Sequence, residues 1–237
     1  LTLARTPRLG RQARAGKALR SRDKGGWAVV PDANNRVLKL QAGEVDMAED
    51  IPANQVAALK GAAGIEVKTT ALMGTGTVLL NMNKFSDPKV RQAVLYAFNQ
   101  KDFLDGVIGD AKYYKECKAM FVCGTPLATT KGWDDKLSSN FEKSKALLKE
   151  AGYDGTPVVL MQSTDLPVLS ILAPVAKYLM EKGCFKVDMQ AMDCQTLVAR
   201  RAKKAPPSQG GWNSFLTSWV AAAVLRRVSR AFSTAAV

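Results

Sequence analysis

The sequence contains no histidine among its 237 residues. This absence excludes Ser-His-Asp and Cys-His catalytic groups and removes imidazole as a metal ligand. The segment GRQARAGKA looks like a phosphate-binding loop, but it has one residue too many between its glycines. In addition, Ala18 stands where a Mg²⁺-binding Ser or Thr is required. We therefore predict no enzymatic activity, no catalytic residue, no metal site and no cofactor.

Long hydrophobic runs are also missing. No apolar stretch approaches the roughly 18 residues that span a membrane. The longest candidate, VLSILAPVAKYLM, is interrupted by Pro174 and Lys177. Hydrophobic residues make up 47% of the chain, which is ordinary for a globular protein, and the length suffices for one large domain or two small ones. The sequence therefore predicts a globular chain without a membrane-spanning helix.

Acidic residues are scarce at both ends. The formal net charge is +13, to which residues 1–24 and residues 200–237 each contribute +7, whereas residues 25–199 sum to −1. A basic surplus can indicate nucleic-acid binding, but aromatic residues that would stack on bases are not interleaved with these charges. We predict that residues 1–24 form a basic leader that is disordered or foreign to the domain. We expect no specific nucleic-acid partner, and a basic nucleic-acid-binding protein is the alternative interpretation.

Only four cysteines are present. Cys117 and Cys123 lie too far apart for a CxxC redox pair, so either a disulfide across ECKAMFVCGTP or two buried thiols would fit the spacing. Cys184 and Cys194 are flanked by apolar, strand-like residues. We expect these two to be packing residues rather than ligands.

Strand and helix patterns alternate from Trp27 onward, which predicts an α/β fold with a largely parallel sheet. Ser86 or Asp87 can cap a helix in which Pro88 suits the first position, and Pro174 should kink or divide a later helix. Apolar periodicity and turn residues predict helices at 32–43, 53–61, 86–99, 101–109, 139–152, 167–183 and 195–204, and strands at 64–70, 76–83, 156–163, 185–193 and 212–220.

Five segments in this order carry a family resemblance: RVLKLQAGEVDMAEDIP, VLLNMNKFSDPKVRQAVLYAFNQKDFLDGVIGD, FEKSKALLKEAGY, LPVLSILAPVAKYLMEKGCFKVDMQAMD and GGWNSFLTSW. Together they span about residues 27–220, and they resemble the family 5 extracytoplasmic solute-binding proteins, the peptide and oligopeptide receptors of ABC importers. No single segment is diagnostic of the family. The agreement of all five segments in order and spacing is what identifies the resemblance.

The resemblance implies a periplasmic-binding-protein-like α/β clamshell that captures a small solute or peptide and delivers it to ABC permease subunits. Residues 25–83 would be the end part of the first lobe, residues 84–211 a nearly complete second lobe, and residues 212–237 a returning strand with a basic tail. The implied location is periplasmic or extracytoplasmic, associated with the membrane through the permease. In that exported setting, Cys117 and Cys123 are expected to form a disulfide.

The resemblance also selects candidate ligand residues. Trp212 and Trp219 can stack on a solute or line the cleft, with core packing as the alternative. Asn81 and Asn83 can hydrogen-bond the solute or the hinge backbone. Peptide-binding members can carry, shortly after the returning Trp, an acidic residue that pairs with the ligand's amino terminus. Here alanines occupy 221–223. The chain matches an internal part of the family, so we expect a fragment that binds peptides weakly or not at all.

The charge distribution predicts where any nucleic-acid affinity resides. A truncated chain covering residues 25–199 should show negligible DNA binding at moderate salt, because its charges sum to −1. The full chain should show at most weak, sequence-independent binding that falls steeply as salt rises. Fluorescence-anisotropy titrations at several salt concentrations measure both. Tight binding by the truncated chain would contradict the interpretation as a solute receptor.

Overall fold

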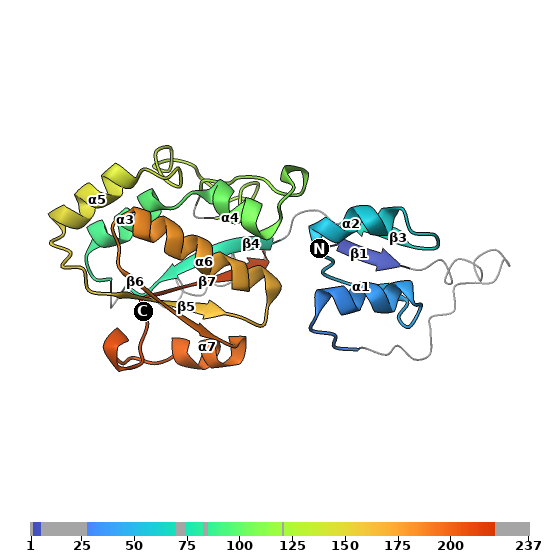
Figure 1. The fold of residues 1–237 in the computed structure, drawn as a ribbon. Helices are drawn as coiled ribbons and strands as arrows, with labels where there is room; N and C mark the ends of the chain where they lie inside the picture. The colour runs from blue at the N-terminus through green and yellow to red at the C-terminus, as the bar shows by residue number, and fades with distance from the viewer. Residues whose placement is uncertain (1, 6–27, 70–73, 83–84, 120, 221–237) are drawn as a thin grey trace, which may run out of the picture. The chain divides into compact units, whose positions relative to one another are not determined.

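The computed structural model describes residues 2–5, 28–69, 74–82, 85–119 and 121–220, and shows two compact units (Figure 1). The smaller unit comprises Leu1–Leu72 with Ile108–Asp110, and the larger comprises Met73–Val107 with Ala111–Val237. In the part of the chain described, no helix is long and apolar enough to cross a membrane. The assignment of residues to two lobes, with its boundary after residue 83, remains a prediction.

The smaller unit combines two helices with a three-stranded antiparallel sheet in the order β2-β1-β3. Asp32 accepts a 2.7 Å hydrogen bond from the Asn35 N–H and caps the first helix, as its sequence predicts. Strand β1 lies in the predicted leader, and for its four residues the structure differs from the expectation of disorder. The elements are β1 (Thr2–Arg5), α1 (Ala33–Gln41), β2 (Met47–Ala48), α2 (Ala53–Lys60) and β3 (Glu66–Thr69).

The larger unit is built on a four-stranded sheet in the order β4-β7-β5-β6. Strand β5 is parallel to both of its neighbours, β6 and β7, whereas β4 pairs with β7 in antiparallel fashion. The α/β prediction is therefore confirmed, with one antiparallel edge strand on an otherwise parallel sheet. The strands are β4 (Gly74–Leu80), β5 (Val158–Ser163), β6 (Val187–Met192) and β7 (Ser214–Val220).

Helices cover both faces of this sheet, with α7 on one side and the others gathered on the opposite side (Figure 1). Alternate residues of β5 supply the two cores: Leu160 packs toward α6, and Met161 packs with Leu197 of α7. Burial on both faces explains the continuous apolar run VVLM in β5. The helices are α3 (Pro88–Ala97), α4 (Gln100–Val107), α5 (Phe141–Glu150), α6 (Pro167–Lys182) and α7 (Cys194–Arg201).

Helix α3 begins where the sequence predicts. Asp87 accepts a 2.6 Å hydrogen bond from the Lys89 N–H, and Pro88 is the first helical residue. Ala93 and Val94 are fully buried against the core, as the amphipathic pattern requires. Helix α3 is therefore scaffold that packs on the sheet.

Helix α6 runs without a break through Pro174, although the sequence predicts a kink or a division there. Proline has no N–H, so the carbonyl of Ser170, four residues earlier, loses its usual helical donor. The side chain of Gln162, on β5, donates its Nε2–H to this carbonyl at 2.8 Å. A side chain from the sheet thus replaces the missing bond. Because this partner lies on β5, outside the helix, the helical pattern by itself does not reveal it.

This replacement predicts a coupling between Gln162 and Pro174. Replacing Gln162 by Ala should lower the free energy of unfolding by about 1 kcal/mol, because the Ser170 carbonyl loses its donor. In the Pro174→Ala background, replacing Gln162 by Ala should lower the free energy of unfolding by clearly less than in the original chain. The reason is that the alanine at 174 has a backbone N–H, which donates the helical hydrogen bond to the Ser170 carbonyl. Pro174 is exposed, so its truncation opens no cavity. Urea unfolding of the four chains in a double-mutant cycle measures the coupling, and equal losses in the two backgrounds would contradict it.

Candidate functional site at the carboxyl edge of the larger sheet

The chain reverses its winding direction between β5 and β7. From β5 it passes through α6 on one face to β6, then returns through α7 on the other face to β7, on the far side of β5. In open α/β sheets, ligands bind outside the carboxyl ends of strands at such a reversal. The carboxyl ends of β5 and β7 are therefore the candidate binding edge of this unit.

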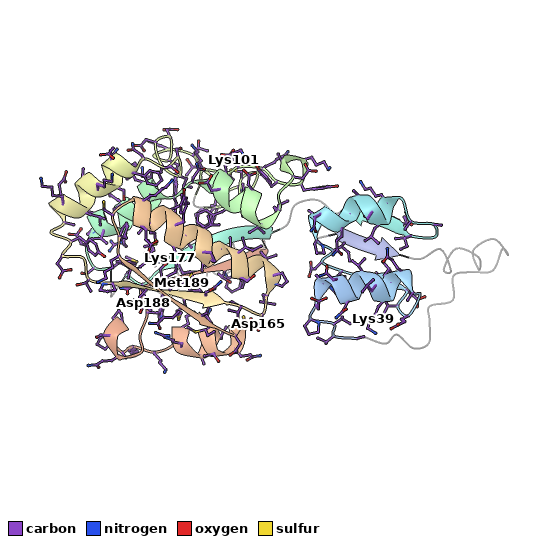
Figure 2. The ribbon with its side chains drawn as sticks, in the orientation of Figure 1. Lys39, Lys101, Asp165, Lys177, Asp188 and Met189 are labelled. Atoms are coloured by element: carbon purple, nitrogen blue, oxygen red, sulfur yellow. A yellow bond between two sulfur atoms is a disulfide. The ribbon has the colours of Figure 1, made fainter. Side chains whose placement is uncertain are left out.

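At the end of β5, polar groups join this strand to its neighbour. Asp165 Oδ1 accepts hydrogen bonds of 2.9 Å from the Ser163 hydroxyl and from the N–H of Cys194, the first residue of α7. The N–H of Thr164 donates to the Met192 carbonyl at 3.0 Å. Figure 2 shows Asp165 beyond the end of β5, on the side of the sheet where α7 begins. These bonds fix the segment in which Asp165 lies.

Asp193 holds the adjacent segment, between β6 and α7. Its two carboxylate oxygens accept hydrogen bonds from the hydroxyl and the N–H of Thr196, at 2.5 and 2.9 Å. These bonds lower the pKa of the Asp193 carboxyl. Both oxygens are thus occupied in capping the helix.

Trp219 lies at this same edge, near the end of β7, and is half-buried. The β5–β7 pairing aligns Leu160 with Ser214 and Met161 with Phe215. Because the two strands are parallel, the carboxyl end of β5, which Asp165 follows, lies at the same edge of the sheet as the carboxyl end of β7, which holds Trp219. Trp219 also pairs with Thr75, near the start of β4. Of the predicted ligand residues, Trp219 is therefore placed at the candidate edge.

Asn81 and Trp212 lie at the opposite edge of the sheet. The Asn81 side chain donates to the Trp212 carbonyl at 3.1 Å, and the Asn81 N–H donates to the Asn213 carbonyl at 2.8 Å. At about 3.3 Å per residue, Trp212 and Trp219 are roughly 20 Å apart along the strand. The structure therefore brings Asn81 and Trp212 together but separates them from Trp219. Asn83 lies outside the described residues.

Trp212 packs in the core. Its side chain is 8% exposed, its indole N–H donates to the Arg201 carbonyl at 3.1 Å, and its ring meets Phe215 edge-on with centroids 5.1 Å apart. Core packing is the alternative to solute contact that the sequence left open for Trp212. Its ring and its donor are both engaged within the protein.

Asn213 is a structural residue that the sequence did not single out. It is 7% exposed, its N–H donates to the Val159 carbonyl at 3.0 Å, and its side-chain oxygen accepts from the Val159 N–H at 2.9 Å. The Asn213 side chain thus adds a hydrogen bond between β5 and the residue that precedes β7. The available signal was a polar residue directly before β7.

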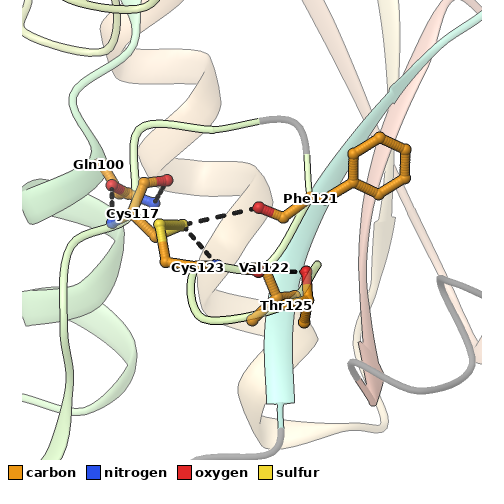
Figure 3. Close-up of a disulfide and its surroundings, with 6 residues drawn as sticks. All are labelled: Gln100, Cys117, Phe121, Val122, Cys123 and Thr125. Carbon is orange, nitrogen blue, oxygen red and sulfur yellow. Dashed lines mark hydrogen bonds between the residues drawn. A yellow bond between two sulfur atoms is a disulfide. The ribbon is translucent and has the colours of Figure 1, made fainter. Parts of the chain in front are cut away.

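A disulfide joins Cys117 and Cys123, whose Cα atoms are 5.8 Å apart (Figure 3). Gln100, the first residue of α4, holds this loop at Cys117: its side chain accepts from the Cys117 N–H at 2.7 Å and donates to the Cys117 carbonyl at 3.1 Å. The small covalent loop is thereby attached to the start of α4.

We predict that protein folded under oxidising conditions retains this disulfide, and that replacing both cysteines by Ala lowers the free energy of unfolding by about 2 kcal/mol, the loop-closure value for so short a loop. Mass mapping of alkylated, non-reduced protein detects the bond, and urea unfolding measures the loss. Cys184→Ser, at an exposed free cysteine, serves as the control. Two alkylated thiols at Cys117 and Cys123 would contradict the prediction.

Within the described ranges, no group of three or more His, Cys, Asp or Glu side chains could hold a metal ion. The edge instead offers a carboxylate, a half-buried indole and two exposed aliphatic side chains, Leu166 (44% exposed) and Val168 (48% exposed). Such a surface suits noncovalent binding of an organic solute.

Comparison with known proteins agrees with this fold. The sequence profile described as bacterial extracellular solute-binding proteins, family 5 (middle), matches residues 15–225, beginning within the predicted leader. A probable peptide ABC transporter periplasmic-binding protein of Sinorhizobium fredii is 30% identical over 197 residues, which cover 80% of this chain and 36% of that protein. The predicted resemblance is thus confirmed.

Two solved structures show the same fold. The ABC transporter substrate-binding protein CtaP of Listeria monocytogenes superposes with a TM-score of 0.67 at 18% identity, over 81% of this chain and 38% of that one. A dipeptide-binding protein of Pseudoalteromonas, in complex with Met-Leu, gives a TM-score of 0.63 at 19% identity, over 81% and 37%. The periplasmic-binding-protein-like fold is confirmed, and the chain spans between 36% and 38% of these relatives' lengths.

Proposed function

This chain belongs to family 5 of the bacterial extracellular solute-binding proteins, and we propose that it forms part of the substrate-binding component of an ABC-type importer. The observation that carries the proposal is the profile match over residues 15–225. The family is one of binding proteins rather than enzymes, in keeping with the absence of histidine from the sequence. In this role the chain contributes contact surface and no covalent chemistry.

The proposed solute is a short peptide or a peptide-like molecule. The Sinorhizobium relative is named for peptide transport, and the Pseudoalteromonas protein holds the dipeptide Met-Leu. The candidate edge supports such a solute, because a peptide presents both apolar side chains and charged or polar groups. A mixed surface of indole, aliphatic side chains and one carboxylate matches both kinds of group.

The proposed partners beyond the solute are the permease subunits of the importer, at the membrane. The family's description as extracellular supports an extracytoplasmic location for the binding protein. Association with the membrane would then run through the permease. The Cys117–Cys123 disulfide is consistent with an oxidising compartment.

Within the proposed site we assign solute contact to Trp219. It is half-buried at the carboxyl edge of the sheet, where an aromatic face can pack on a solute. Trp212 packs in the core against Phe215, and Asn81 hydrogen-bonds the Trp212 carbonyl at the opposite edge of the sheet. Asn83 keeps its predicted role of hydrogen-bonding solute or hinge backbone.

The test is a calorimetric titration of the full chain with a panel of di- and tripeptides. Trp219→Ala should weaken the binding of responsive peptides about tenfold, the loss expected when one aromatic contact worth about 1.4 kcal/mol is removed. Tyr178→Ala is the matched control, since it removes an exposed aromatic side chain from α6 in the same unit. Circular dichroism establishes that both variants fold. Folded chain that gives no saturable heat with any peptide would refute peptide binding by this chain and would agree with the sequence-based expectation of a fragment that does not bind peptides.

A further inference from the structure

The exposed carboxylate of Asp165 is used on only one of its two oxygens. Both of its hydrogen bonds, from the Ser163 hydroxyl and the Cys194 N–H, arrive at Oδ1. No ion pair joins Asp165 to another side chain within the ranges that the structure describes. Because the residue is exposed, Oδ2 remains an available acceptor. No pattern in the sequence singles out this carboxylate.

The two donors also fix the orientation of the carboxylate. Ser163 is 2% exposed and lies in β5, and Cys194 is the first residue of α7, so both donors belong to rigid elements. The Cys194 N–H is one of the first-turn groups that the helix itself leaves unbonded, and the start of a helix favours a nearby negative charge. Asp165 is therefore held in place before any ligand arrives, which reduces the entropic cost of binding.

The neighbours of Asp165 define what such a carboxylate could bind. Trp219, near the carboxyl end of β7, lies at the same edge of the sheet, and the exposed Leu166 and Val168 follow Asp165 in sequence. Two other polar residues of this edge are engaged: Thr164 bonds the Met192 carbonyl, and Asp193 bonds Thr196. The surface thus combines one anionic acceptor with apolar contacts.

We propose that Asp165 binds the ammonium group of a peptide-like solute through Oδ2, with an adjacent apolar side chain of the solute packing on Trp219, Leu166 and Val168. The proposal rests on the proposed solute-binding function. The ammonium comes from the peptide's amino terminus or from a lysine side chain.

Asp165 also links β5 to α7, so a binding role must be separated from a structural one. Asp165→Asn keeps an oxygen that can accept from Ser163 and Cys194 but removes the charge. Asp193→Asn is the matched control: it removes the same charge at the same edge, from a carboxylate whose oxygens are both engaged by Thr196. Thermal unfolding reports whether each variant retains the fold.

The experiment is a protein-observed NMR titration of the full chain, a method that also registers weak binding. The probes are leucyl-alanyl-alanine, its N-acetylated form, and N-acetyl-lysyl-alanyl-alanine. Asp165→Asn should weaken the binding of leucyl-alanyl-alanine about tenfold, as expected for loss of a charge-assisted hydrogen bond, and leave the acetylated form unchanged. Asp193→Asn should change neither. The lysyl peptide shows whether a side-chain ammonium is bound in the same way.

The outcomes separate the two hypotheses. Equal effects of Asp165→Asn on the free and the acetylated peptide, or no effect on either, would overturn the ammonium site while leaving peptide binding intact. If Asp165→Asn and Asp193→Asn weaken peptide binding equally, the loss of any negative charge at this edge would explain the effect. That result would also overturn the ammonium site at Asp165. If the unmodified chain binds none of the three peptides, the proposed function fails for this chain, and the ammonium site fails with it.

Discussion

The joint between Asn213 and Val159 is the interaction on which the larger unit depends. The N–H and side-chain oxygen of Asn213 both bond the backbone of Val159, and its carbonyl accepts from the Asn81 N–H. One residue thus connects β5, β7 and the end of β4. Because β7 is the last strand in sequence yet lies between β4 and β5, this joint closes the sheet around a segment that arrives late in the chain. The two cores on either face follow from that insertion, since Phe215 and Leu216 of β7 contribute to opposite sides.

Insertion of β7 also creates the candidate binding edge. A β7 that paired with β6 would continue the winding in one direction, and no reversal would exist at β5. With β7 beside β5 in parallel, Trp219 and Asp165 are brought to the same edge of the sheet, although more than fifty residues separate them in sequence. The other end of the sheet is occupied by interior contacts of Asn81, Trp212 and Asn213. One edge of the sheet is therefore available to a solute, and the other holds the unit together.

Several polar side chains in this unit are explained by partners that lie outside their own helix or strand. Gln162 bonds the carbonyl that Pro174 leaves without a helical donor, and Gln100 bonds both backbone groups of Cys117. In each case a side chain restores a hydrogen bond that the local backbone cannot make, which the cost of an unsatisfied buried group favours. Asp165 differs from these cases, because its second oxygen has no such partner among the described residues. The proposed ammonium site rests on this difference.

The sequence by itself determined the local elements and the family. Asp87 and Pro88 fixed the start of α3, the run VVLM identified a strand buried on both faces, and five ordered segments identified the family. The tertiary structure was needed for the strand at Thr2–Arg5, the continuous helix at Pro174, the burial of Trp212, and the placement of Asp165 and Trp219 at one edge of the sheet. Caps and periodicity depend on residues within one or two helical turns, so they can be recognised in a short window of sequence. Strand order and register depend on pairing between distant segments, and a short window holds no information about the partner.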